Sequence, residues 1–238
     1  MVKNKIYLAL SRIKRIFFDL FIINKFNKKN IFHLIYKNNY WDSKESVSGP
    51  GSDLKSTENI RRELPLLISK YGIKNILDIP CGDFNWMKKI LDKLDVDYLG
   101  CDIVDELIDK NKNFYTTNKI KFSKLDLIKE KLPVSDLLIC RALFFHLDFL
   151  SIDKILKNLK KANIKYILLT NCPKLDNHIN KNIPIGQYRD LDLFKEPLFF
   201  PNNYLYKFED VHNLDTAQIE QEMILWKKDD LINNLNLR

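Results

Sequence analysis

Short apolar runs alternate with amphipathic stretches over much of the chain. Five runs predict buried strands, at residues 75–79, 98–103, 120–127, 136–141 and 165–170. The stretches between them predict helices, at 84–94, 104–114 and 152–159. Two later runs, at 204–208 and 223–227, have no clear helix between them and predict an antiparallel hairpin. The pattern therefore predicts an α/β fold, with a doubly wound, mostly parallel sheet and helices on both faces.

The first 40 residues follow a different pattern, in which a broad apolar stripe is surrounded by lysines and arginines. This is typical of one or two amphipathic basic helices, which either lie on an anionic membrane surface or pack on their own domain or a partner subunit. We expect residues 1–40 to form a separate extension and residues 41–238 to form the main domain. Residues 43–57 are rich in loop formers and predict a linker or a lid. A helix follows that Ser56 or Thr57 could cap, with an early break at Pro65.

Composition narrows the choice of partner and compartment. The 238 residues carry a formal charge of +8, but lysines are scattered among acids, so we do not expect a nucleic-acid partner. No apolar run is long enough to span a bilayer, and no secretory signal is present, which indicates a cytoplasmic protein, with the inner face of the membrane as an option. No metal-ligand spacing is found, so we expect no metal. The four cysteines form no CxxC pair and are interpreted as small buried hydrophobic residues, with thiols near a cofactor as the alternative.

The most informative motif is the sequence from Asn75 to Met87, NILDIPCGDFNWM. An apolar run ends at Asp78, a tight turn containing Gly82 follows, and the next residues have a helical pattern. This order of strand, turn and helix start is where open α/β sheets bind nucleotide cofactors. Asp102 lies about 20 residues beyond Gly82, at the end of the next strand, where a carboxylate can accept both ribose hydroxyls. The third strand supplies a further acid, Asp126.

Together with other landmarks, this motif resembles class I S-adenosylmethionine (SAM)-dependent methyltransferases. The resemblance covers residues 45–230 and is greatest to a bacterial branch often linked to surface-polysaccharide modification. Its landmarks are SGPGS at 48–52, DIPCGDFNW at 78–86, GCDIV at 100–104, LICR at 138–141 with His146, and GQYRDL at 186–191. Pro80 and Phe84 stand where the common pattern has glycine, and this argues against NAD, whose fingerprint needs three glycines.

The resemblance implies a Rossmann-like fold, SAM as cofactor, and a set of cofactor contacts. Asp78 would orient the turn and reach the methionine amine, Cys81 and Gly82 would line the methionine and ribose, and Asp102 would bind the ribose. The adenine would lie among Ile103, Asp126 and Leu127, while Arg141 would sit beside the sulfonium. We also expect the N–H groups of a helix N-terminus after Gly82 to face the methionine carboxylate.

His146 is the preferred catalytic base, because methyl transfer to an alcohol requires removal of its proton. The alternative is that His146 caps the next helix or packs against the cofactor. Many members of the branch carry an acid where this chain has Ala142. Asp190 is a second candidate base in a long loop, 171–201, which we expect to be an acceptor-binding insertion. Tyr188 and Arg189 of that loop would bind the acceptor, unless Arg189 and Asp190 only form a stabilising ion pair.

The function predicted from these residues is O-methylation of a small molecule or sugar, such as a surface-glycan precursor. Two alternatives stay open. The first is RNA or protein methylation, which the charge of +8 suggests, although an Asn-Pro-Pro-Tyr-type motif is absent. The second is a non-catalytic, SAM-binding scaffold subunit, which the basic N-terminal stretch suggests. The pattern does not specify an oligomeric state.

Overall fold

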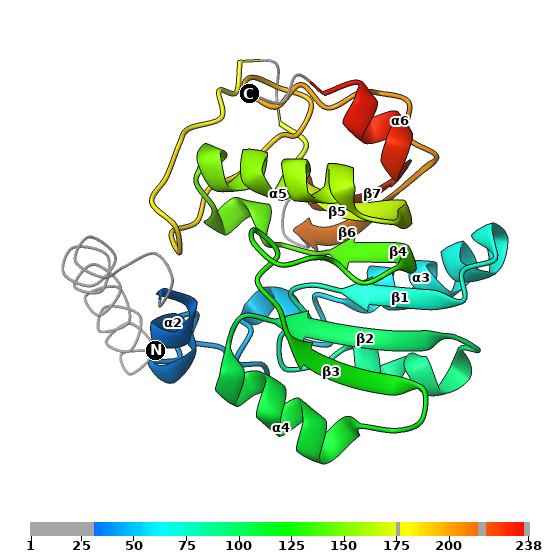
Figure 1. The fold of residues 1–238 in the computed structure, drawn as a ribbon. Coiled ribbons are helices and arrows are strands. Elements are labelled where there is room, and N and C mark those ends of the chain that lie inside the picture. Colours follow the sequence, from blue (N-terminus) through cyan, green and yellow to red (C-terminus); the bar gives the residue numbers. More distant parts are fainter. Residues whose placement is uncertain (1–30, 175–176, 214–217, 236–238) are drawn as a thin grey trace.

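The computed structural model describes residues 31–174, 177–213 and 218–235. Its centre is a seven-stranded sheet in the order β3-β2-β1-β4-β5-β7-β6, in which β1 to β5 are parallel and β7 is antiparallel to both neighbours (Figure 1). The strands are β1 (Asn75–Asp78), β2 (Asp97–Asp102), β3 (Ile120–Lys124), β4 (Ser135–Cys140), β5 (Ile164–Asn171), β6 (Tyr206–Asn213) and β7 (Gln218–Lys227). The prediction of a Rossmann-like, mostly parallel sheet with an antiparallel edge hairpin is confirmed.

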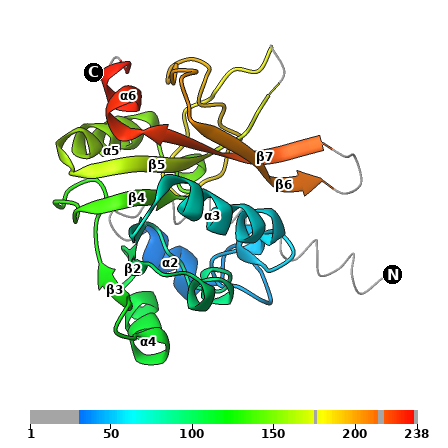
Figure 2. The same cartoon turned by 90° about the vertical axis from the view of Figure 1, so that its right-hand side faces the viewer.

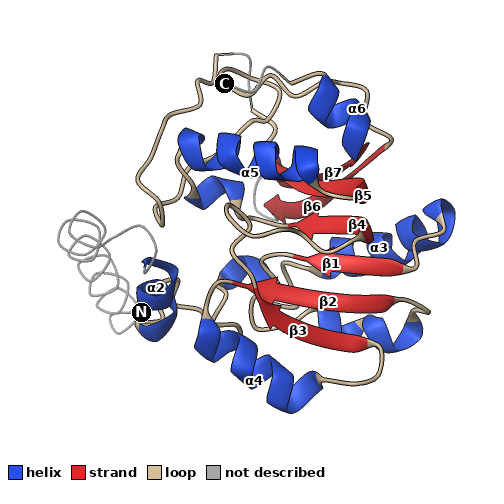
Figure 3. Cartoon of the chain, in the orientation of Figure 1, coloured by secondary structure: helices blue, strands red, loops and turns tan. Residues whose placement is uncertain are grey.

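Helices cover both faces of this sheet, as the alternating pattern predicted. The helix α5 lies with α6 on one face and α3 lies on the other, which is clearest in Figure 2 and in the secondary-structure colouring of Figure 3. The described α-helices are α2 (Ile31–Lys37), α3 (Glu58–Tyr71), α4 (Asp105–Tyr115), α5 (Phe149–Lys161) and α6 (Lys228–Asn233). None of the described helices combines the length and the apolar character that crossing a bilayer requires.

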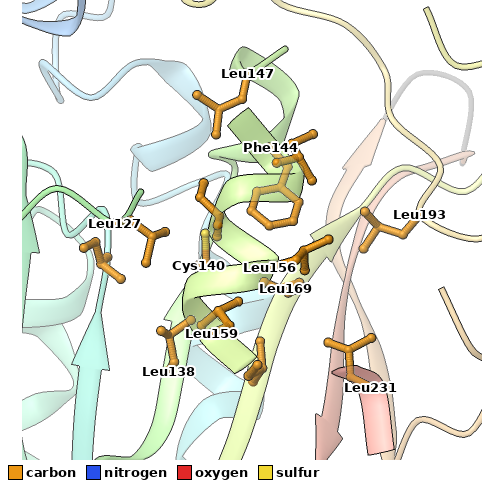
Figure 4. Close-up of a cluster of buried hydrophobic side chains, with 14 of the residues drawn as sticks. Leu127, Leu138, Cys140, Phe144, Leu147, Leu156, Leu159, Leu169, Leu193 and Leu231 are labelled. Carbon is orange, nitrogen blue, oxygen red and sulfur yellow. The ribbon is translucent and has the colours of Figure 1, made fainter. Parts of the chain in front are cut away.

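The core is divided into two clusters by the sheet. In the first cluster, the buried residues of α5 recur at helical spacing and form one apolar face of the helix. This face packs on the strands, as Figure 4 shows for Leu156 and Leu159 beside Leu138 and Leu169. Burying a leucine of this kind contributes roughly 1.5–3 kcal/mol. The four cysteines are buried and free, so their interpretation as small buried residues is confirmed.

The predicted helix over 84–94 is wrong. Two 3₁₀ turns, η4 (Met87–Lys89) and η5 (Leu91–Lys93), replace it. Phe84 has a φ of 59°, outside the right-handed helical region, and its buried ring packs edge-on against Phe122 at 5.0 Å. The side-chain amide of Asn85 donates to Glu45 at 2.7 Å. Contacts with distant parts of the chain therefore fix a backbone that no α-helix can contain, although Met87 and Leu91 are buried as expected.

Two local predictions also change. The helix α3 runs through Pro65 without a break, because its inner residues Ile60, Leu64 and Leu67 are buried on both sides of the proline. Thr57 stands at its N-cap, but its hydroxyl donates to the Asp53 carbonyl at 2.9 Å and accepts from no backbone N–H of the helix. The strand β3 ends at Lys124, so Asp126 lies in the loop beyond the strand in which it was predicted.

The expected boundary at residue 40 does not isolate α2 from the domain. Ile31 and Ile35 of this helix are 2% and 1% exposed and belong to the main core. A Cβ atom added to Gly186, in the loop that follows β5, would lie 2.8 Å from Ile31 Cγ1, so the helix and that loop are in close contact. Residues 1–30, which carry most of the predicted basic amphipathic pattern, lie outside the described residues.

Candidate cofactor and acceptor site

A pocket lies where the carboxyl ends of β1 to β4 converge, and α2 lies beside this end of the sheet (Figure 1). His146 lines this pocket together with every residue predicted to contact a cofactor, namely Asp78, Cys81, Gly82, Asp102, Ile103, Asp126, Leu127 and Arg141. The structure thus brings together residues that span much of the sequence. Their individual roles toward a cofactor remain predictions.

The turn after β1 is joined to the loop at residues 43–52. Gly82 has a φ of 56°, and a Cβ atom there would lie 3.0 Å from Ser48 Cβ. The Ser48 hydroxyl accepts from the Asp83 N–H at 2.9 Å, while the Asp83 carboxylate accepts from the Val47 N–H at 2.9 Å. Glycine is therefore required here by the loop that covers the turn as well as by the backbone angle.

Asp102 ends β2 and faces the same turn. Its carboxylate accepts from the Gly82 N–H at 3.2 Å and from the Val104 N–H at 3.1 Å. Burial raises the pKa of this carboxyl, and the backbone hydrogen bonds counteract that effect. Each oxygen still has a lone pair for a further donor, so the group can accept two hydroxyls at once.

Asp78 is the most strongly perturbed acid in the pocket. Its carboxylate accepts a hydrogen bond of 2.6 Å from the Tyr98 hydroxyl and is 2% exposed as a residue. Burial raises its pKa to about 7, against the opposing effects of the Tyr98 hydrogen bond and of Arg141. A carboxyl that is half ionised near neutral pH gains from a cation placed beside it.

Apolar side chains also line the pocket. Among them are Leu127, which is 5% exposed, and Ile103, which directly follows β2. The Asp126 carboxylate accepts from the Ile128 N–H at 2.9 Å, which holds its loop in a tight turn. A lining that combines two apolar side chains with an acid suits a flat heteroaromatic ring that carries an amine.

Two of the three guanidinium nitrogens of Arg141 are engaged by protein groups, one of them in an ion pair. Its Nε donates to Asp210 at 2.7 Å, and the two side chains are 5% and 0% exposed. Its Nη1 donates to the Gly51 carbonyl at 2.7 Å, which ties the 43–52 loop to β4 and to β6. The Nη2 atom is buried and has no hydrogen-bond partner among the described residues.

His146 lies in the 3₁₀ turn η6 (Phe144–His146) beyond β4. Its Nδ1 atom is 3.0 Å from the Gln187 carbonyl oxygen. A carbonyl oxygen can only accept, so this contact assigns the proton to Nδ1 and the lone pair of the neutral ring to Nε2. The ring lies between Trp41 and Tyr188, with centroid distances of 5.3 and 5.7 Å. Asp148, not His146, is the N-cap of α5.

The Tyr188–Asp190 segment packs beside His146 without lining the cofactor pocket. The expected ion pair between Arg189 and Asp190 is not formed. Asp190 instead pairs with Lys174 at 3.0 Å and accepts from the Tyr188 hydroxyl at 2.8 Å. Burial works to raise the pKa of Asp190, but these two partners outweigh it and keep the pKa below its ordinary value. Asp190 thus lies outside the cofactor pocket with two partners for its charge, whereas His146 lines that pocket.

Besides Trp86, three aromatic residues from the N-terminal part of the described chain, which the sequence did not assign to the site, line the pocket. Phe32 and Tyr36 come from α2, and Trp41 follows it. The predicted boundary placed the first two in a separate extension. The aromatic residues clustered at 32–41 were a sequence signal for a binding site. Only the packing of α2 against the loop around Gly186 shows that these residues line the pocket.

No family model matches the sequence, and a search of curated proteins found none with significant sequence similarity. Solved structures do match. A Leishmania major SAM-dependent methyltransferase aligns with a TM-score of 0.61 at 17% identity, over 84% of this chain and 86% of that chain. "PigF with SAH" (S-adenosylhomocysteine) aligns with a TM-score of 0.60 at 14% identity, over 83% of this chain and 62% of that one. The chain has the fold of SAM-dependent methyltransferases.

Human N-acetylserotonin methyltransferase in complex with SAM has the same fold, with a TM-score of 0.52 and 14% identity. The alignment covers 84% of this chain and 56% of the human one. The chain thus spans less than two thirds of the human protein and of PigF. At these identities the methyltransferase fold is what the likeness establishes.

Proposed function

We propose that the protein is a SAM-dependent methyltransferase that transfers a methyl group to a hydroxyl of a small molecule. One observation carries the proposal. The buried carboxylate of Asp102, at the end of β2, lines the same pocket as the Gly82 turn and the His146 ring. An acid with lone pairs for ribose hydroxyls, a close backbone turn and a candidate base therefore line one cavity of a methyltransferase fold, and this supports the proposal.

The lining residues fit SAM in chemical type. Asp102 has lone pairs for the two ribose hydroxyls, and the apolar side chains of Ile103 and Leu127 suit the faces of the adenine ring. Asp126 lines the same pocket, and its carboxylate can accept from the adenine amine. Asp78, whose pKa burial raises to about 7, can ionise beside the methionine ammonium.

The methionine carboxylate needs a different partner from the one predicted. No helix begins after Gly82, and the Gly82 and Asp83 N–H groups already donate to Asp102 and Ser48. Among the described residues that line the pocket, Arg141 is the one lysine or arginine. We assign the carboxylate to its unpaired Nη2 atom, in place of the sulfonium contact first expected.

The chain's own chemistry is alignment and proton removal. SAM supplies an activated methyl group, which an acceptor oxygen attacks in line with the carbon–sulfur bond. The Gln187 carbonyl holds His146 in the tautomer whose Nε2 can take the acceptor's proton. Gly186 donates its N–H to the His146 carbonyl at 2.8 Å, so the same loop fixes both the ring and the backbone of the base.

The acceptor class that we favour is a sugar. The rings of Trp41 and Tyr188 flank His146 and offer apolar faces of the kind that pack on the C–H face of a sugar ring. Tyr188, at 51% exposed, is open to an incoming acceptor. The motif resemblance to the branch linked to surface polysaccharides supports a glycan precursor as the acceptor and the cytoplasm as the compartment.

Methyl transfer from labelled SAM to a panel of hexoses and hexose phosphates tests this proposal. His146→Asn keeps a donor near Gln187 but has no basic nitrogen, so we expect transfer to fall about 100-fold or more while SAM affinity stays within about twofold. Asp190→Asn tests the second candidate base and is measured at saturating acceptor, because Asp190 also pairs with Lys174; we expect a loss of less than about threefold. A large loss in Asp190→Asn with none in His146→Asn would overturn the assignment of the base.

A further inference from the structure

A second pocket lies in the loop that follows β5, and its lining residues Arg189 and Asp190 directly follow Tyr188, whose ring contacts His146. Its charged lining residues are Lys174, Lys181, Arg189 and Asp190, which give a formal charge of +2 with His178 neutral. Lys181 is exposed, and Lys174 is half-buried and paired with Asp190. The pocket is therefore positive as well as open to solvent.

Arg189 is the buried member of this group. It is 7% exposed, and its guanidinium lies over the Phe149 ring at 4.7 Å. Its Nε and Nη1 atoms are buried and have no hydrogen-bond partner among the described residues. Burial lowers its pKa to about 10 against the opposing effect of the nearby Asp148 charge, which leaves the group charged at neutral pH. A buried cation with unpaired donors costs free energy, and an anion in the adjoining pocket would offset that cost.

The second pocket and His146 are connected through a short stretch of chain. The Arg189 N–H donates to the Phe145 carbonyl at 3.1 Å, one residue before His146. Tyr188 places its ring against His146 at 5.7 Å and donates its hydroxyl to Asp190, which lines the second pocket. A ligand that extends past Tyr188 would therefore reach both the base and the basic pocket.

We propose that this pocket binds a phosphate group of the acceptor, so that the methylated molecule is a phosphorylated sugar or a sugar joined to a nucleoside diphosphate. A phosphate monoester carries a charge of roughly −1.5 to −2 near neutral pH, which complements the formal +2 of the pocket. A single carboxylate would leave a positive charge unbalanced. This inference rests on the proposed function, because it names the acceptor of the same site.

The test titrates a free hexose, inorganic phosphate, a hexose 1-phosphate and a uridine diphosphate hexose into the full-length protein saturated with S-adenosylhomocysteine, and anionic phospholipid vesicles are titrated separately. We expect the two sugar phosphates to bind more tightly than the free hexose. Lys181→Gln should weaken their binding up to about fivefold, as for an exposed charge pair, and Lys174→Gln/Lys181→Gln should weaken it further. Lys160→Gln, which removes an exposed charge near the other end of α5, is the control and should have no effect.

Three outcomes would overturn the inference. The first is that S-adenosylhomocysteine binds while none of the phosphorylated ligands does. The second is that anionic phospholipid vesicles bind in their place. The third is that Lys181→Gln and Lys160→Gln give the same affinities as wild type. Failure of S-adenosylhomocysteine to bind would instead contradict the proposed function, and phosphate binding is then measured without it.

Discussion

At the scale of single residues, the pocket is built from ionisable groups that have been removed from water. Asp78, Asp102 and Asp210 are all buried, and burial raises the pKa of each. Arg141 lines the same pocket and pairs with Asp210. Such a group of buried charges costs stability in the unliganded protein, and clusters of this kind are common at functional sites.

Asp78 gives a pH prediction with a definite sign. Its pKa rises from 3.8 to about 7 in the folded protein, so the folded state favours the neutral carboxyl and ionisation favours unfolding. The stability from this group is fully present below about pH 4 and is lost as the pH rises through 7. Between pH 5 and 8 the loss is about 3 kcal/mol. Asp78→Asn is neutral throughout and should lack this component when urea unfolding of the two proteins is compared. Parallel pH curves for wild type and variant would contradict the assignment.

At the scale of elements, the strands and their terminal acids were predictable and the connections between them were not. The apolar runs located each parallel strand, and Asp78 and Asp102 follow from where those runs end. The helix expected after Gly82 failed because Asn85 is held by Glu45, a contact 40 residues apart in sequence. Periodicity reports local pattern only, so it could not anticipate this contact or the packing of α2 over the pocket.

Substitutions at two glycines test the contact between the turn after β1 and the loop at residues 43–52. Gly82→Ala adds a Cβ atom at a positive φ and against Ser48, so we expect a loss of about 1–3 kcal/mol in unfolding free energy. Binding of S-adenosylhomocysteine should weaken in parallel, because the turn lines the pocket. Gly51→Ala meets no atom within 4 Å and has no positive φ, and it should be nearly neutral. Equal effects of the two changes in urea unfolding would show that the loop is not tightly joined.

The helix α2 gives a second prediction at this scale. Ile35 is buried against the core, and Phe32 and Tyr36 of the same helix line the pocket. Ile35→Ala should cost about 2–5 kcal/mol of unfolding free energy and reduce affinity for S-adenosylhomocysteine, because α2 then loses its anchor. Lys37→Ala, on the exposed side, should change stability by less than about 0.5 kcal/mol. Unchanged ligand affinity in Ile35→Ala would mean that α2 is not part of the cofactor site.

At the scale of the whole molecule, the site depends on segments from across the sequence. The Arg141 guanidinium, beyond β4, joins Gly51 of the N-terminal loop to Asp210 of β6 in the C-terminal hairpin. The sheet order brings these segments together, and Figure 1 shows the loop after β5 at the same end of the sheet as α2. Ligand binding should therefore stabilise the whole domain and raise its melting temperature as the ligand concentration increases.

Calorimetric titration with S-adenosylhomocysteine tests the central claim most directly. The account predicts saturable binding at one site in wild type. It also predicts a loss of about 10- to 100-fold in Asp102→Asn, which removes the charge that accepts the ribose hydroxyls. NAD should not bind, because the turn lacks the glycines that NAD requires. Absence of S-adenosylhomocysteine binding by wild type, or equal affinity in Asp102→Asn, would contradict the account.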